Sequence, residues 1–393
     1  MKTAFMKTKM QGLGLLLISA TVLLGCNNTT AQPREEESST VKPTVEKESK
    51  IQVALLLDTS NSMDGLIDQA KSRLWNIVNT LTTLKYEGKT PDIEIALYEY
   101  GNDNLSEKSN FIRQVTPLTT DLDLISEKLF ALKTNGGNEY CGAVIQDATN
   151  QLKWDDGAVN MKLIYIAGNE AFTQGTINYK EAIATALQNK IFINTIFCGN
   201  QAQGISGLWK DGADKGQGKF FTIDSNAAVQ YINTPYDDQI SICNDKMNDT
   251  YIGYGSMGES KKMNQMEQDK NAESVSYANK TERAISKSKK VYTNTNWDLV
   301  DKVKQDKDVL AKLKKEELPK EYQNKTKEEI NAIVAQKTQQ REQLQKEIAE
   351  LAKKRQEFID AEAKKKNTQD DLGDAIGSSI VSLAKSKGFT LEK

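Results

Sequence analysis

The sequence predicts an α/β fold: a doubly wound, mostly parallel sheet of six strands, followed by an α-helical region. Two observations lead to this prediction. In the first half of the chain, apolar runs alternate with segments in which apolar residues recur every three or four positions, as expected for strands alternating with helices. The second half is rich in Lys, Glu, Gln and Asn and carries helical patterns. Apolar residues make up 38% of the chain, so part of it should lie outside a well-filled core.

The first strand is expected at 51–57, a continuous apolar run typical of a strand covered on both faces. A short strand at 111–115 is expected at an edge of the sheet. The other strands are expected at 93–100, 162–167, 191–198 and 219–223, and helices at 66–81, 121–132, 142–152, 179–188 and 227–246, the last interrupted at Pro235. Together they form a first domain over 51–254, and ligands of such sheets bind at the carboxyl ends of the strands.

Residues 1–26 have the features of a targeting segment. A basic head with Lys2, Lys7 and Lys9 precedes an apolar stretch over 13–24, which is too short to span a bilayer comfortably. This pattern predicts a signal peptide.

The stretch ends in Leu23-Leu24-Gly25-Cys26, which resembles the lipobox of bacterial lipoproteins. The resemblance implies cleavage before Cys26 and its thioether lipidation, and hence a lipid anchor in the bacterial cell envelope. The alternative is an uncleaved anchor with an incidental cysteine. Polar residues over 27–50 are expected to form a flexible tether, and Asn27 gives no inner-membrane retention cue, which favours the outer membrane.

The composition excludes several classes of function. The chain has no histidine, which removes Ser-His-Asp and Cys-His catalysis and the commonest zinc ligand. The net charge is −2, so no basic surplus points to a nucleic-acid partner. A carboxylate-based or cofactor-based enzyme is not excluded by these counts.

Directly after the first strand, the loop Asp58-Thr59-Ser60-Asn61-Ser62 places three oxygen-bearing side chains at alternate positions. Alternate side chains of a tight loop can point to one centre, and carboxylate and hydroxyl oxygens suit Mg²⁺. Asp and Ser are also the best helix N-caps, so the loop has a second explanation that involves no metal. The pattern Asp58-x-Ser60-x-Ser62 resembles the metal-ion-dependent adhesion site of von Willebrand factor type A domains.

The resemblance implies two further loops. The family supplies a threonine after paired glycines, and here Asn138 occupies its place after Gly136 and Gly137. The family also places an aspartate after the fourth strand, where this chain has Gly168, so Asn169 or Glu170 would replace it, or would only cap the following turn. The predicted metal ligands are Asp58, Ser60, Ser62, Asn138, Asn169 and Glu170.

In related domains a carboxylate from the partner protein completes the coordination of the cation. The resemblance therefore implies Mg²⁺ (or Mn²⁺ or Ca²⁺) as cofactor and a protein partner that offers an acidic side chain, in adhesion or assembly. We expect a binding protein and not an enzyme. Two alternatives stay open: an envelope lipoprotein with a degenerate site whose helices bind, and an enzyme that uses a carboxylate base beside the cation.

Cysteines and glycines give three local expectations. Cys141 and Cys198 should both lie at the top of the sheet, which suggests a disulfide between them, and Cys243 is expected to be buried in a helix. A glycine-punctuated segment over 204–218 matches no phosphate-binding loop. Trp209 within it is expected to pack against the sheet rather than to form a binding surface.

Residues 255–393 are expected to form helices at 265–288, 297–313, 326–366 and 370–387. Thr326 and Glu329 form a capping box, and Gly388 is a plausible C-cap. Lys337, Arg341 and Arg355 interrupt the apolar seam of the long helix, which favours a helical hairpin or lateral packing over a two-stranded coiled coil. The region is expected to brace the first domain, with a partner-binding coiled coil as the alternative.

Overall fold

The computed structural model describes residues 49–363 and 372–392. These described residues belong to one compact unit. The predicted signal peptide, the lipidation at Cys26 and nearly all of the tether lie outside the described residues. None of the described helices is both long and apolar enough to cross a membrane.

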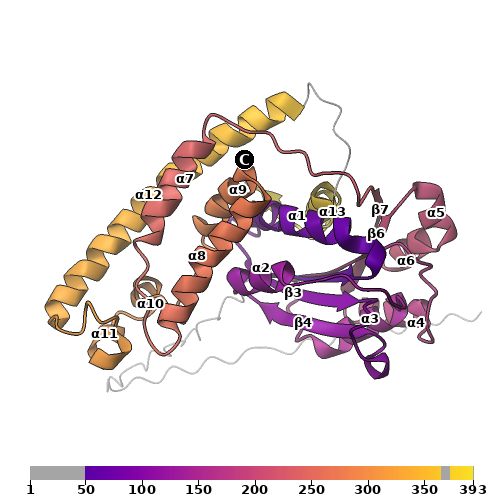
Figure 1. The fold of residues 1–393 in the computed structure, drawn as a ribbon, viewed down its shortest axis with the longest axis horizontal. Helices are drawn as coiled ribbons and strands as arrows, with labels where there is room; N and C mark the ends of the chain where they lie inside the picture. The colour runs from indigo at the N-terminus through magenta and orange to yellow at the C-terminus, as the bar shows by residue number, and fades with distance from the viewer. Residues whose placement is uncertain (1–48, 364–371, 393) are drawn as a thin grey trace, which may run out of the picture. The chain divides into compact units, whose positions relative to one another are not determined.

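A six-stranded sheet in the order β4-β3-β1-β5-β6-β7 forms the centre of the unit (Figure 1). Its strands are β1 (Lys50–Asp58), β3 (Asp92–Tyr100), β4 (Ile112–Thr119), β5 (Met161–Gly168), β6 (Ile191–Cys198) and β7 (Gln217–Ile223). All neighbours are parallel except β4, which pairs antiparallel with β3 at one edge. The predicted doubly wound, six-stranded sheet and its edge strand are confirmed.

Two groups of helices cover the two faces of the sheet. Along β1, Val53, Leu55 and Leu57 point into one apolar core and Ala54 and Leu56 into the other, because successive strand residues face opposite ways. The first core contains α1 (Asp64–Thr82), α2 (Leu122–Phe130) and α13 (Leu372–Ser386). The second contains α3 (Cys141–Gln151), α4 (Tyr179–Gln188) and the beginning of α6 (Trp209–Lys215).

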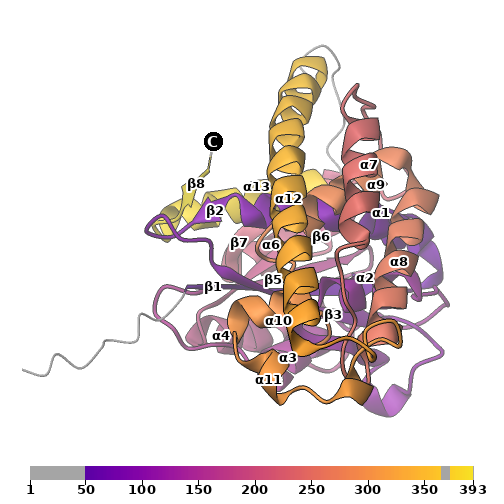
Figure 2. The same cartoon turned by 90° about the vertical axis from the view of Figure 1, so that its left-hand side faces the viewer.

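The second half of the chain shares the core of the first. It contributes α7 (Asp237–Asn248), α8 (Gly258–Val275), α9 (Tyr277–Lys287), α10 (Leu299–Gln305), α11 (Val309–Lys312) and α12 (Lys327–Ala363), besides α13. Helix α12 lies alongside α7 (Figure 2), and its Ile348 and Leu351 belong to the same core as Leu55 and Leu74. The short strands β2 (Leu84–Lys85) and β8 (Thr390–Leu391) pair with each other. The sequence division near residue 254 is therefore not a gap between two separately packed bodies.

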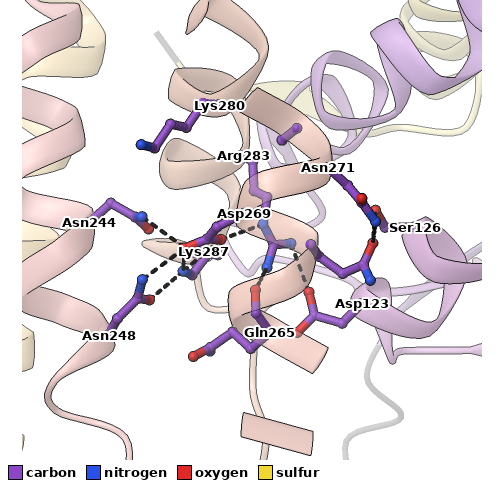
Figure 3. A network of polar contacts seen from close by, with 12 residues as sticks. Asp123, Ser126, Asn244, Asn248, Gln265, Asp269, Asn271, Lys280, Arg283 and Lys287 are labelled. Carbon is purple, nitrogen blue, oxygen red and sulfur yellow. Dashed lines mark hydrogen bonds and ion pairs between the residues drawn. The ribbon is translucent and has the colours of Figure 1, made fainter. Parts of the chain in front are cut away.

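Buried ion pairs fasten these helices to one another. Figure 3 shows Arg283 of α9 donating to Asp123 of α2 at 2.7 Å and to Asp269 of α8 at 2.6 Å, while Lys287 donates to Asp269 at 2.9 Å. In α12, Arg341 donates to Asp298 at 2.6 Å. Ion pairs of this kind fix the orientation of a helix, because a buried charge without its partner is costly.

The charges that interrupt the predicted seam of α12 have a structural role. Arg341 and Arg355 are 1% and 3% exposed, and Arg355 donates to Asp237 of α7 at 2.9 Å and also pairs with Glu282 of α9. The interruptions thus mark where the long helix is fastened to its neighbours. The predicted lateral packing is present, and the capping box of Thr326 and Glu329 is confirmed.

Several predicted boundaries change. The helix expected over 227–246 begins only at Asp237, after Pro235, which cannot continue a helix. The segment expected as one helix over 265–288 is divided by Ser276, which leaves the helical conformation and caps α9 through its hydroxyl. Helices α5 (Gln201–Ser206) and α6 occupy the glycine-punctuated segment, where none was expected. Trp209 is fully buried, as predicted.

Candidate metal centre

The loop after β1 lies at the carboxyl end of the sheet, and its side chains converge. The Asp58 carboxylate is fully buried, and its Oδ1 accepts a 2.7 Å hydrogen bond from the Ser60 amide. The hydroxyl oxygens of Ser60 and Ser62 are 3.3 Å apart. Ser60 precedes the short 3-10 helix Asn61–Met63 but makes no capping hydrogen bond with its side chain. N-capping therefore does not account for these oxygens.

Glu139, and not Asn138, completes the second loop. Asn138 is exposed, whereas Glu139 is 3% exposed and its carboxyl group lies within hydrogen-bonding reach of Asp58. The Glu139 amide donates to Gln174 Oε1 at 2.7 Å, which holds the backbone at this point. The loop turns the side chain of Asn138, the predicted ligand, to solvent and that of Glu139 inward, so Glu139 and not Asn138 lies beside Asp58.

Two glycines make room for the Asp58 carboxylate. Gly101 has a φ of +76°, and a Cβ there would lie 2.8 Å from both Asp58 Oδ1 and the Cγ of Glu139. At Gly168, a Cβ would lie 2.5 Å from the hydroxyl of Tyr100 and 3.1 Å from Asp58 Oδ2. That hydroxyl donates to the Ala167 carbonyl at 2.9 Å. The Tyr100 hydroxyl thus occupies the space that a side chain at position 168 would take.

The third loop brings one of its two predicted ligands to the site. Asn169 Nδ2 donates to the Ser62 hydroxyl at 3.0 Å. Glu170 is exposed, and its backbone carbonyl accepts a 2.7 Å hydrogen bond from the indole of Trp209. Glu170 therefore lies at the rim of the cluster, while the Asn169 amide contacts it through Ser62.

The cluster contains buried oxygen atoms without partners. Asp58 Oδ2, Glu139 Oε2 and Asn169 Oδ1 have no hydrogen-bond partner among the described residues. Burial raises the pKa of Asp58 well above its usual value, and the neighbouring carboxyl of Glu139 raises it further. Burial likewise raises the pKa of Glu139. The two carboxyl groups are disfavoured as anions as long as nothing offsets their charge. A hard divalent cation fits this arrangement, because it would be coordinated by the oxygen atoms and would offset the negative charges of both Asp58 and Glu139.

The donor set is mixed. Within residues 49–363 and 372–392, no three His, Cys, Asp or Glu side chains are arranged to hold a metal ion. The cluster contains two such groups, Asp58 and Glu139, and the other candidate donors are the hydroxyls of Ser60 and Ser62 and the amide of Asn169. Oxygen donors of this kind match Mg²⁺, Mn²⁺ and Ca²⁺ better than softer metals.

The cysteines near the sheet are free and buried. The predicted disulfide between Cys141 and Cys198 is not formed, because Cys141 packs in the core on one face of the sheet and Cys198 in the core on the other. Cys141 Sγ instead lies 4.0 Å from the hydroxyl of Tyr100. Cys243 is buried in α7, as predicted.

Comparisons with solved structures find distant likenesses. Proximal thread matrix protein 1 from the mussel byssus is 12% identical with a TM-score of 0.33, and the match covers 44% of this chain and 41% of that one. An aerotolerance-related membrane protein from Bacteroides fragilis is 16% identical with a TM-score of 0.31, and the match covers 45% of this chain and 93% of that one. The pilus adhesin SpaC from Lactobacillus rhamnosus GG is 11% identical with a TM-score of 0.34, and the match covers 46% of this chain and 29% of that one. The chain thus matches about two fifths of the length of the mussel protein.

A search of curated proteins finds no match. The family model described as the von Willebrand factor type A domain matches residues 52–235. This range begins in β1 and contains the other five strands of the sheet together with the loops of Asp58, Glu139 and Asn169. Residues 52–235 therefore form a von Willebrand factor type A domain.

Proposed function

We propose that this protein binds a protein partner through a divalent cation held at the carboxyl end of its sheet, and that the role is one of recognition and not of catalysis. The observation that carries the proposal is the convergence of Asp58 Oδ2, Glu139 Oε2 and Asn169 Oδ1, three acceptors without partners among the described residues, beside the hydroxyls of Ser60 and Ser62. Domains of this family commonly mediate protein–protein interaction or adhesion.

The ligand set leaves room for the partner. Asp58, Ser60, Ser62, Glu139 and Asn169 offer at most five donor side chains, whereas Mg²⁺ prefers about six ligands. We propose that an acidic side chain of the partner supplies an oxygen at a remaining position. Asp58 and Glu139 together carry two negative charges, which balance the charge of the cation. The partner's carboxylate therefore supplies a coordinating oxygen more than it neutralises charge, and we expect a moderate affinity between the partner and this domain.

Titration calorimetry of residues 49–393 with MgCl₂ and MnCl₂ tests the cation. Binding of about one cation is expected, with loss in Asp58→Ala and no change in Asp306→Ala, which removes a carboxylate far from the cluster. Absence of binding, or binding that survives Asp58→Ala, would leave the domain as a structural unit with a degenerate site.

Cross-linking in the cell envelope tests the partner. The wild-type chain is expected to give a cross-linked product that disappears with chelator and in Asp58→Ala, and that persists in Asp306→Ala. A product that is unaffected by chelator and by Asp58→Ala would place binding elsewhere in the chain.

We further propose that Cys26 anchors the chain in the bacterial envelope, with the outer membrane favoured. The lipobox-like run before Cys26 and the polar segment after it support this. Metabolic labelling with an alkyne fatty acid is expected to mark the wild-type chain and not Cys26→Ser. Equal labelling of both would contradict the anchor, and sucrose-gradient fractionation would show which membrane holds it.

A further inference from the structure

A surface hollow of about 420 Å³ lies next to the candidate metal centre. We define the β6 hollow by six of its lining residues, which come from the loop after β5, the end of β6 and α5: Asn169, Glu170, Phe197, Cys198, Gln203 and Ser206. Asn169 belongs to both sites, since it lines the hollow and donates to Ser62 at 3.0 Å. Anything that coordinates the cation therefore has the β6 hollow as its neighbour.

The hollow is held open by fixed contacts beneath it. The indole of Trp209 donates to the Glu170 carbonyl at 2.7 Å, and the Phe172 amide donates to the Gly207 carbonyl at 2.9 Å. The rings of Phe172 and Phe197 lie 4.9 and 5.7 Å from the ring of Trp209, centroid to centroid. Because hydrogen-bonded backbone and packed rings form the hollow, its residues do not need to become ordered when a ligand binds. The entropic cost of binding there is therefore lower.

The lining favours an occupant that donates hydrogen bonds and carries positive charge. Glu170 contributes an exposed carboxylate, and none of the described lining residues is Lys or Arg. The Ser206 hydroxyl donates to the Gln203 carbonyl at 3.1 Å, so its oxygen remains available as an acceptor. The ring of Phe197 offers an apolar wall for an aliphatic stem.

We infer that the β6 hollow seats a basic side chain of the partner, Lys or Arg, a few residues from the acidic side chain that coordinates the cation. This inference rests on the proposed function and adds a specificity determinant to it. Glu170 then acts in partner recognition instead of as a metal ligand. The partner's recognition segment would carry both signs of charge at short spacing.

Synthetic peptides provide the probe. Each fluorescent peptide carries one Glu and, one to three positions away, either Arg or citrulline, which has nearly the same shape without the charge. Dissociation constants are measured by polarisation in MgCl₂ against wild type, Glu170→Gln, Asp58→Ala and Glu328→Gln. Glu328 is an exposed carboxylate of α12, so its variant has the same net charge as Glu170→Gln and serves as the matched control.

The inference predicts that at least one Arg peptide binds wild type and Glu328→Gln several-fold more tightly than its citrulline twin, and that this advantage vanishes in Glu170→Gln. All binding should be lost in Asp58→Ala. Magnesium-dependent binding without any preference for Arg, or with a preference that survives Glu170→Gln, would overturn the inference alone. If no peptide binds in a manner that needs Mg²⁺ and Asp58, both the inference and the proposed function fail. Thermal melts of Glu170→Gln like those of wild type would show that the fold is intact.

Discussion

The carboxyl groups of Asp58 and Glu139 meet above Gly101, whose missing side chain leaves space for both. The two residues are 81 positions apart in the sequence and come from different loops at the carboxyl end of the sheet. Burial disfavours both anions, so their proximity is unfavourable until a cation or a proton joins them. This pair is the feature on which the metal proposal depends.

The first prediction separates Glu139 from its neighbour. Glu139→Gln should weaken Mg²⁺ binding by about 10-fold or more, because it removes one of two charges that face the cation. Asn138→Ala changes the exposed residue beside it and should leave the affinity unchanged. Calorimetric titration of both variants checks this, and equal effects of the two changes would refute the assignment.

The second prediction concerns Gly168. Gly168→Ala should lower the free energy of unfolding by about 1–3 kcal/mol, because its Cβ would lie 2.5 Å from the Tyr100 hydroxyl inside a packed core. Tyr100→Phe removes that oxygen, so the double variant should lose less than the sum of the two single variants. Chemical denaturation of the four chains gives the comparison, and strict additivity would contradict the clash.

The third prediction concerns acid stability. Arg283 and Lys287 hold the pKa of Asp269 well below its usual range despite the burial of that carboxyl. Its contribution to stability is therefore complete above the unfolded pKa of about 3.9 and is lost as the pH falls through the lower folded value. Asp269→Asn should cost about 3–5 kcal/mol at pH 7, since it leaves buried cations under-compensated, and the cost should shrink toward pH 3.

Guanidinium unfolding at pH 7 and pH 3 measures this cost. Glu267→Gln, on the exposed side of the same helix, is the control and should change stability by less than about 0.5 kcal/mol at either pH. A cost of Asp269→Asn that is small, or the same at both pH values, would show that the network in Figure 3 does not contribute in this way.

The fourth prediction tests the shared core. Ile380 of α13 is fully buried in the core that also contains β1 and α1. Ile380→Asp places a charge there and should destabilise the whole unit by several kcal/mol, whereas Ser382→Asp adds the same charge at an exposed position of the same helix. Hydrogen exchange that rises only in α13 in the Ile380 variant, with β1 protected, would mean that this helix is not part of one cooperative unit.

Regular patterns in the sequence were enough to predict the sheet and the place of the first loop of the candidate metal centre. Apolar runs such as 51–57 are buried on both faces, and such burial leaves a direct trace in the sequence. Asp58, Ser60 and Ser62 follow immediately after the run, so their place at the end of the strand followed from the strand itself.

Glu139 could not be found in the same way. The loop from Gly136 to Tyr140 has no periodicity, and Gly137 adopts a φ of +154°, so adjacent side chains point in directions that no repeat predicts. The charge of Glu139, two residues after the paired glycines, was the available signal, but a resemblance based on position pointed to Asn138. Cys141 and Cys198 show the same limit, since both lie near the top of the sheet but on opposite faces.

The helical half was predicted as helices but not as part of the core. Arg341 and Arg355 interrupt an apolar seam when α12 is considered alone, yet both are buried because their partners Asp298 and Asp237 come from distant parts of the chain. A pairing between charges so far apart in sequence leaves no local pattern. It becomes visible only once the helices are packed.

The most direct test of the account is a crystal structure of residues 49–393 grown with MnCl₂, with an anomalous difference map calculated at the manganese edge. The account predicts a peak about 2.1–2.3 Å from Asp58 Oδ2 and from the hydroxyls of Ser60 and Ser62, with Glu139 and Asn169 turned toward it. A map without a peak among these oxygens, with the Asp58 and Glu139 carboxyls in direct contact instead, would contradict it.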